Sequence, residues 1–417
     1  MAKFSIAVLK LPDFRRLVLT RSFALMALQS QAVIVGWQIY SITKDPFMLG
    51  LTGLVEAIPA LTTALFAGHI VDNSRPHRVY QTALGVLALN TFVLWLLAGG
   101  VIHLPGGHVL LILYCGVFIS GIARAFIMPS SFSLLPQIVP REQISAAAAW
   151  LSTGLEIATI GGPAVAGLLF AYTSAEGAWL MPVTLLTISF CIFATMSGKT
   201  RQFRSTQVRE AALKSIIAGW RYILKNPALL SVMALDMFAV LFGGAVAMLP
   251  AYADQVLHVG AEGLGFLRAS PAIGAVSMAL LLALRPFKTI RATTLLVAVT
   301  GFGLSIIGFG LSEVFWLSAL FLALTGVFDA ISVVIRSTLI QLLTTDNVRG
   351  RVSSVNSMFI ISSNEIGSFE SGLAARTLGL VPSVVFGGAM TLVVAALTAS
   401  LSKKFRRTVI HTESPIP

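Results

Sequence analysis

The 417-residue chain is strongly apolar and basic, with 56% hydrophobic residues, 11% charged residues and a formal net charge of +12. Its mean hydropathy of +0.87 lies far above that of soluble domains, so the composition excludes a soluble globular protein. The basic residues occupy short connections between apolar segments. There they orient helices and touch anionic headgroups, so the charge does not indicate nucleic-acid binding.

Twelve apolar segments are each long enough to cross the hydrocarbon core as a helix, which satisfies its own backbone hydrogen bonds. They cover residues 16–42, 47–71, 79–102, 109–136, 142–172, 179–197, 227–253, 263–284, 290–312, 314–341, 352–376 and 380–401. The predicted fold class is therefore an all-α membrane protein with twelve transmembrane helices.

The basic residues alternate between the two sides of this arrangement. The amino terminus, the even-numbered connections and the carboxyl tail hold all but five of the 29 Lys and Arg. The odd-numbered connections hold Lys44 and Arg376, and three more lie inside spans. By the positive-inside rule both termini are expected in the cytoplasm, which agrees with an even number of spans. Residues 1–16 do not resemble a cleavable secretory signal, so the first apolar segment is expected to be retained as a span.

Catalytic and cofactor motifs do not emerge from the sequence. There is no phosphate-binding loop for ATP, no metal-ligand spacing among the six His, and no arguable Ser-His-acid arrangement. Cys115 and Cys191 both fall inside apolar spans, which disfavours a disulfide framework. We expect no enzyme activity, no cofactor, no metal and no use of ATP.

The longest polar stretch divides the chain into two six-helix halves. We predict an amino-terminal bundle at residues 1–197, a cytoplasmic linker at 198–226, and a carboxyl-terminal bundle with a basic tail at 227–417. Within the linker, residues 208–225 have the pattern of an amphipathic helix on the membrane surface, acting mainly as a tether.

The two halves resemble each other in register, which predicts pseudo-symmetric bundles. Residues 53–60 (GLVEAIPA) align with residues 265–272 (GFLRASPA), so that Glu56 falls on Arg268. Gly121 and Gly326 begin matching segments, which places Arg124 opposite Asp329. Gly162 and Gly167 likewise meet Gly367 and Gly372. Parallel repeats of this kind suggest a transporter whose site lies between the halves near the middle of the membrane.

Nine charged residues interrupt the spans, although a charge in the membrane is costly and usually functional. They are Glu56, Arg124, Glu156, Asp236, Arg268, Asp329, Arg336, Glu365 and Glu370. Arg124 and Glu156 could neutralise each other, and Glu56 could pair within its own half. Alternatively, Glu56 and Arg268 could form a gate between the halves, with Arg336 as a further gate element.

Acids outnumber bases among these residues, so complete pairing is impossible. Carboxyls that exchange a proton as water access alternates would couple transport to protons, and Asp329, Glu365 and Asp236 are the candidates. A second set is predicted to line the substrate cavity, although its amides could equally join helices: Arg124, Glu156, Gln29, Gln31, Asn364 and Glu370.

Residues 349–372 (RGRVSSVNSMFIISSNEIGSFESG) resemble the segment around span eleven of one bacterial branch of the major facilitator superfamily. This branch includes the enterobactin exporter and multidrug and macrolide efflux carriers. The resemblance extends over the whole chain and implies two six-helix bundles. It also implies that spans one, four, seven and ten line the cavity.

Two superfamily motifs are partly present. Residues 68–72 (GHIVD), followed by Arg75 and Arg78, resemble the cytoplasmic gating motif, in which the acid Asp72 would pair with basic groups. Asn73 and Pro76 depart from that pattern. Residues 161–167 (GGPAVAG) resemble the antiporter motif of span five, and Gly162 and Pro163 would permit close approach and bending.

Together these features predict export of a small organic molecule, a siderophore or a hydrophobic drug, across the bacterial inner membrane by proton antiport. The expected partners are the substrate, protons and lipid, without nucleic acid, and the expected state is a monomer. Proton-coupled uptake and translocation of a phospholipid or lysophospholipid remain alternatives. A membrane enzyme or receptor is a third, less favoured class.

Overall fold

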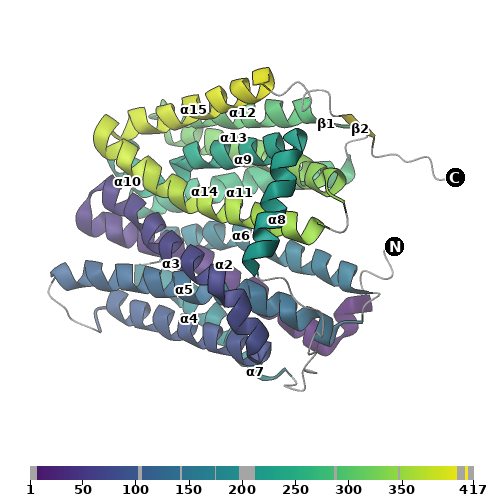
Figure 1. Cartoon of the computed structure of the whole chain (residues 1–417). Helices are drawn as coiled ribbons and strands as arrows, with labels where there is room; N and C mark the ends of the chain where they lie inside the picture. The colour runs from purple at the N-terminus through teal and green to yellow at the C-terminus, as the bar shows by residue number, and fades with distance from the viewer. Residues whose placement is uncertain are drawn as a thin grey trace. The chain divides into compact units, whose positions relative to one another are not determined.

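The computed structural model describes residues 7–101, 106–140, 143–173, 175–196, 212–285, 289–345, 348–401 and 409–411. Long helices make up nearly all of this part of the chain (Figure 1). In the first half they are α2 (Pro12–Thr43), α3 (Pro46–Asn73), α4 (Pro76–Ala98), α5 (Gly106–Ile138), α6 (Ile144–Tyr172) and α7 (Ala175–Ala194), after the short η1 (Val8–Lys10). Proline opens α2, α3 and α4, where its missing N–H costs no intrahelical hydrogen bond.

The second half begins with the linker helix α8 (Ala212–Lys225). It continues with α9 (Pro227–Phe242), η3 (Gly244–Met248), α10 (Leu249–Gln255), α11 (Gly260–Leu284), α12 (Ala292–Gly310), α13 (Phe315–Leu343), α14 (Arg349–Leu378) and α15 (Leu380–Leu401). Two short strands, β1 (Thr289–Arg291) and β2 (Val409–His411), pair antiparallel with Ile290 opposite Ile410. This pairing joins the carboxyl tail to the connection that precedes α12.

Eleven helices among the described residues are long and apolar enough to cross a membrane. They correspond to the predicted spans except span eleven, whose helix α14 has 30 residues but is not among the eleven. Its sequence carries Asn356, Asn364, Glu365 and Glu370, so its polarity and not its length sets it apart. The prediction of long membrane helices from residues 16 to 401 is thus confirmed in outline.

Span seven differs from the single helix expected at residues 227–253. The helix breaks after Phe242 into the 3-10 turn η3 and the short α10. Gly243 and Gly244 lower helix propensity at this point. Gly244 also lies against α14, where a Cβ would stand 2.9 Å from the carbonyl oxygen of Gly367. Close packing against α14 therefore accompanies the break.

The chain divides into two compact units. Unit 1 comprises Met1–Ile42 and Val55–Ala212, and unit 2 comprises Thr43–Leu54 and Leu213–Pro417. In unit 1, buried side chains of α2, α4, α5 and α7 form one apolar cluster. In unit 2, a second cluster draws on α8, α9, α12, α13, α14 and α15. Helices in lipid gain little from hydrophobic burial, so close van der Waals packing of this kind holds each unit together.

The linker helix α8 docks on unit 2 along one edge. The Tyr222 hydroxyl donates to the carbonyl of Leu343 at 3.2 Å, and Ile223 is fully buried. Ile217, Trp220 and Leu224 form an exposed apolar stripe on another face. The predicted first residues of this helix, 208–211, lie outside the described part of the chain. The exposed stripe is compatible with the predicted membrane surface, while the docked edge was not expected.

Candidate transport site: buried ion pairs and helix contacts

Unit 1 contains a partly buried ion pair between α3 and α5. Arg124 Nη1 lies 2.8 Å from Glu56 Oε1, and the two side chains are 21% and 17% exposed. The helices touch just beside it, because a Cβ on Gly121 would lie 2.7 Å from the carbonyl oxygen of Glu56. Glu56 thus has a partner within its own half, which was one of the alternatives. Glu156 lies exposed on α6 and has an interaction of its own.

Unit 2 contains a more deeply buried ion pair between α9 and α13. Asp236 and Arg336 form a salt bridge, and both residues are buried. The negative charge of Asp236 is therefore neutralised by the guanidinium of Arg336. Of the three coupling candidates, Asp236 is therefore tied most firmly to a structural role, and Arg336 is its counter-charge.

The remaining polar residues of unit 2 lie on α11, α13 and α14. Arg268 on α11 is half-buried, and its Nε has no hydrogen-bond partner. Asp329 is exposed on α13, while Glu365 and Glu370 are half-buried on α14. Exposed Asn364 donates to the carbonyl of Ile360 at 2.8 Å. These residues offer three carboxyls and one cation within a single unit.

The two predicted cavity glutamines have different surroundings. Gln31 is 4% exposed, and its amide joins three helices: Nε2 donates to Ser120 Oγ at 3.0 Å and Oε1 accepts from Thr91 Oγ1 at 2.7 Å. Asn90 also donates to Ser120 Oγ at 3.0 Å. Gln31 is therefore better described as a packing residue than as a cavity residue. Gln29 is half-buried and stays a candidate.

The antiporter-like motif lies at a close contact between α6 and α2. A Cβ on Gly162 would stand 2.8 Å from the carbonyl oxygen of Met26 and 2.8 Å from Gln29 Cβ. The Ser30 hydroxyl donates to the carbonyl of Gly162 at 3.1 Å. Pro163 follows inside α6. Gly162 is therefore needed for close packing of α6 against α2. Its predicted role in gating stays a prediction.

The cytoplasmic motif is only partly described. Arg75 directly precedes α4 without a capping hydrogen bond from its side chain, and both Arg75 and Arg78 are exposed. The side chain of Asp72 lies outside the described residues, so its predicted pairing stays a prediction.

A contact that sequence reasoning missed joins residues 43–54 to α10 and α14 of unit 2. Lys44 Nζ lies 2.9 Å from Asp254 Oδ2, and Arg376 Cζ lies 4.9 Å from the Phe47 ring centroid. Phe47 also meets Phe369 edge to face, with ring centroids 6.1 Å apart. Lys44 and Arg376 are the two basic residues of the odd-numbered connections. Their presence on connections that otherwise lack basic residues is the sequence feature that could have indicated a role for them.

A second missed residue is Arg21 on α2, which is absent from the nine membrane charges predicted from the sequence. It is only 4% exposed, and its Cζ lies 5.5 Å from the centroid of the Phe132 ring. Its Nε lacks a hydrogen-bond partner. The signal was its position, well inside the first apolar helix.

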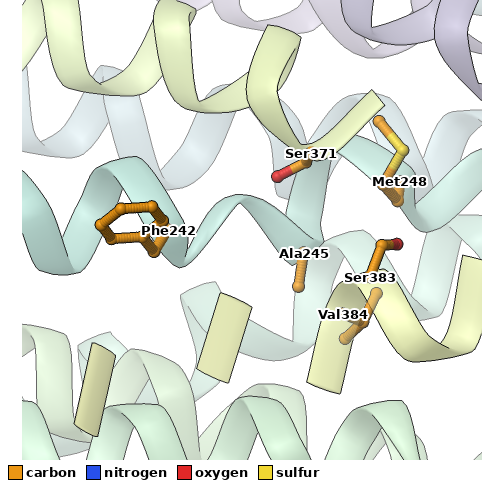
Figure 2. Close-up of a pocket in the computed structure, with 6 residues that line it drawn as sticks. All are labelled: Phe242, Ala245, Met248, Ser371, Ser383 and Val384. Carbon is orange, nitrogen blue, oxygen red and sulfur yellow. The ribbon is translucent and has the colours of Figure 1, made fainter. Parts of the chain in front are cut away.

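A small pocket lies within unit 2. Figure 2 shows a gap beside the break in span seven, lined by Phe242, Ala245, Met248, Ser371, Ser383 and Val384. Its empty volume of about 180 Å³ includes the part open to solvent, whereas ligand pockets usually exceed about 300 Å³. We do not regard it as a substrate site. Within the described part of the chain, no three His, Cys, Asp or Glu side chains gather as metal ligands would.

Comparison with known proteins identifies the family. The model of the transmembrane secretion effector family, MFS_3, matches residues 4–413. The enterobactin exporter EntS of Shigella boydii serotype 4 (strain Sb227) is 24% identical over 396 residues, covering 95% of this chain and 93% of the relative. EntS of Citrobacter koseri is 24% identical over 406 residues, covering 97% and 95%.

Solved structures of similar fold cover nearly the whole chain. A bacterial homologue of the human lysosomal transporter Spinster, inward-facing and unoccupied, has a TM-score of 0.70 at 14% identity, covering 95% of this chain and 98% of that one. A D-xylose-proton symporter has a TM-score of 0.70 at 12% identity, covering 92% and 96%. At these identities the likeness shows the fold alone. The chain belongs to the transmembrane secretion effector family of the major facilitator superfamily, and it is a multi-pass membrane transporter, not an enzyme.

Proposed function

We propose that this protein exports a small organic molecule across the bacterial inner membrane in exchange for protons, by alternating access. The direction rests on the family description, transmembrane secretion effector, and on relatives named as enterobactin exporters. A siderophore or a hydrophobic drug is the proposed substrate class. Both termini are proposed to be cytoplasmic, and the transporter is proposed to act as a monomer.

The observation that carries proton coupling is the imbalance of charge in unit 2. Its spans hold Asp236, Asp329, Glu365 and Glu370 against Arg268 and Arg336. The Asp236–Arg336 salt bridge accounts for one acid and one base. Acids outnumber bases in the spans of this unit. A charged carboxyl is costly in a membrane, so an excess of acids over bases favours carboxyls that take up and release a proton as water access changes.

The contact of residues 43–54 with α10 and α14, which we propose to lie on the outer side of the membrane, supports alternating access. Its salt bridge and its aromatic contacts are individually weak and partly exposed, so they can break and re-form at little cost. We propose that these residues separate from α10 and α14 when the transporter opens outward.

Transport by inside-out vesicles tests the function. Vesicles with an acidic lumen should accumulate enterobactin or ethidium, used as a siderophore probe and a drug probe. Asp329→Asn should abolish accumulation against a gradient, because the exchanged proton has no site. Asp13→Asn is the matched control, since Asp13 pairs with Arg16 at 2.9 Å near the start of α2. It should transport normally.

Two results would overturn the proposal. Accumulation that occurs only in right-side-out vesicles would show proton-coupled uptake. Movement of a labelled phospholipid in liposomes without a pH gradient, with no transport of either probe, would show lipid translocation.

A further inference from the structure

The internal repeat relates two charge pairs of opposite polarity. The alignment of residues 53–60 with 265–272 places Glu56 of α3 on Arg268 of α11. The alignment that starts at Gly121 and Gly326 places Arg124 of α5 on Asp329 of α13. Unit 1 therefore has the acid on the earlier helix and the base on the later one. Unit 2 has the same two positions with the signs exchanged.

In unit 1 the two positions meet. Gly121 packs against the turn that begins at Glu56, with its would-be Cβ 2.7 Å from Glu56 O and 3.0 Å from Pro59 Cγ. Arg124 follows Gly121 by one turn on the same face of α5. From there it reaches the carboxylate of Glu56 at 2.8 Å.

In unit 2 the equivalent helices, α11 and α13, also touch through glycine. Gly326 lies against the carbonyl oxygen of Pro271, and its would-be Cβ is 3.0 Å from Ala275 N. Pro271 and Ala275 follow Arg268 by one and two turns, so Arg268 lies on the face of α11 that meets α13. Asp329 follows Gly326 by about one turn of α13.

The two units therefore differ in register. The glycine of α5 faces the charged residue of α3, whereas the glycine of α13 faces the residue three positions beyond the charged residue of α11. Three residues correspond to an axial shift of about 4.5 Å. Arg268 accordingly makes no hydrogen bond or ion pair with any residue in the described part of the chain, and its Nε is unsatisfied. A cation in a membrane span is costly without a partner.

We propose that Arg268 is the exchangeable counter-ion of Asp329, and that the two pair when α11 moves by about one turn against α13, as Glu56 and Arg124 pair in unit 1. The inference rests on the proposed proton antiport. A proton on Asp329 removes the charge that Arg268 binds, so the ion pair and the proton exclude each other. In this structure Asp329 already interacts with another group. Pairing with Arg268 would therefore replace that interaction.

Few other charged residues lie on the helices that pack against α13, so few could pair with Asp329 in place of Arg268. The helices with the most extensive packing against α13 are α11, α12 and α9. α12 carries no charged residue, and α11 carries Glu262 in its first turn besides Arg268. The charged residue of α9 is Asp236, which is held by Arg336 of α13.

Charge exchange tests the proposal directly. Arg268→Glu places two acids together and Asp329→Arg places two bases together, so each should lower downhill efflux of ethidium at least tenfold. The double variant Arg268→Glu/Asp329→Arg restores opposite charges with the polarity already present in unit 1. It should recover downhill efflux to within about threefold of the wild type, while accumulation against a gradient stays lost. Glu56→Arg/Arg124→Glu is the matched swap in unit 1.

A proximity measurement guards against variants that fail to fold. The chain has two cysteines, so Cys115→Ser/Cys191→Ser provides a cysteine-free background. Arg268→Cys/Asp329→Cys should be cross-linked by a short dithiol-reactive reagent as the transporter cycles, and Glu56→Cys/Arg124→Cys is the positive control.

The outcomes separate the two proposals. No cross-link under conditions that fully link the control, or no rescue by the swap while the unit 1 swap transports, would overturn the Arg268–Asp329 exchange and leave export intact. Failure of the wild type to accumulate any probe with an acidic lumen would overturn the proposed function itself.

Discussion

Gly50 of α3 and Gly372 of α14 lie in direct backbone contact: a Cβ built on Gly50 would stand 2.7 Å from the Cα of Gly372. The next turn of α3 repeats the contact, because a Cβ on Gly53 would lie 2.9 Å from Ser368 Cβ. Small residues allow helices in a membrane to approach this closely. Residues 43–54 can therefore fit against α14 only while these positions remain small.

Replacing Gly372 with valine should prevent this contact from closing. The expected result is a transporter biased toward the outward-open state, with efflux of ethidium reduced at least tenfold and normal membrane insertion. Labelling of Phe369→Cys by a membrane-impermeant maleimide, in the cysteine-free background, measures the opening. Leu373→Val, at an exposed neighbouring position on α14, is the control. Unchanged labelling in Gly372→Val would contradict a closing role.

The salt bridge between Lys44 and Asp254 should matter for transport more than for stability. Both side chains are substantially exposed, at 57% and 35%, and exposed pairs contribute roughly 0.2–1 kcal/mol. Asp254→Asn should therefore leave the midpoint of thermal unfolding almost unchanged while increasing the same Phe369→Cys labelling. A large loss of thermal stability would show that Asp254 is a structural residue.

The buried pair of Asp236 and Arg336 should behave in the opposite way. Removing one partner leaves an uncompensated buried charge, at a cost of about 3–5 kcal/mol. Arg336→Met should therefore sharply reduce the folded fraction seen by size-exclusion chromatography. The double variant Asp236→Leu/Arg336→Met should regain most of it, because no charge remains buried. A double variant as unstable as Arg336→Met would show that the salt bridge is not the origin of the loss.

Gln31 should prove to be a stability residue and not a substrate contact. Gln31→Leu leaves Thr91 and Ser120 each with one hydrogen bond fewer in a buried site, at a cost of about 1–3 kcal/mol. Thermal unfolding should occur at lower temperature, while the relative efflux of enterobactin and ethidium stays the same. Gln29→Leu, at a half-buried position two residues away, is the comparison. A changed preference between the probes in Gln31→Leu alone would return Gln31 to the substrate cavity.

The amino-acid sequence identified the positions of the helices well, because the requirement behind them is local. About 20 consecutive apolar residues are needed to cross a membrane, and that length can be read without knowing any neighbour. The break of span seven at Gly243 and Gly244 is the clearest difference. Two glycines alone rarely end a membrane helix, and the contact with Gly367 that accompanies the break is visible only in the folded chain.

The candidate site was predicted by residue type but not by partnership. The nine membrane charges, the excess of acids and the repeat that relates Glu56 to Arg268 all follow from the sequence. Pairing depends on which turns of two helices meet, and a shift of one turn changes it. Arg124 therefore forms a salt bridge with Glu56, whereas Arg268 has no such partner among the described residues.

The sequence by itself determined that this is a multi-pass membrane protein of long apolar helices, because hydrophobic length acts on each segment separately. Only the tertiary structure decided that Asp236 is neutralised by Arg336 and that Gln31 joins three helices. It also decided that Lys44 and Arg376 take part in the contact between residues 43–54 and unit 2. Those outcomes depend on helix register, which is set by side-chain and glycine packing between segments far apart in the chain.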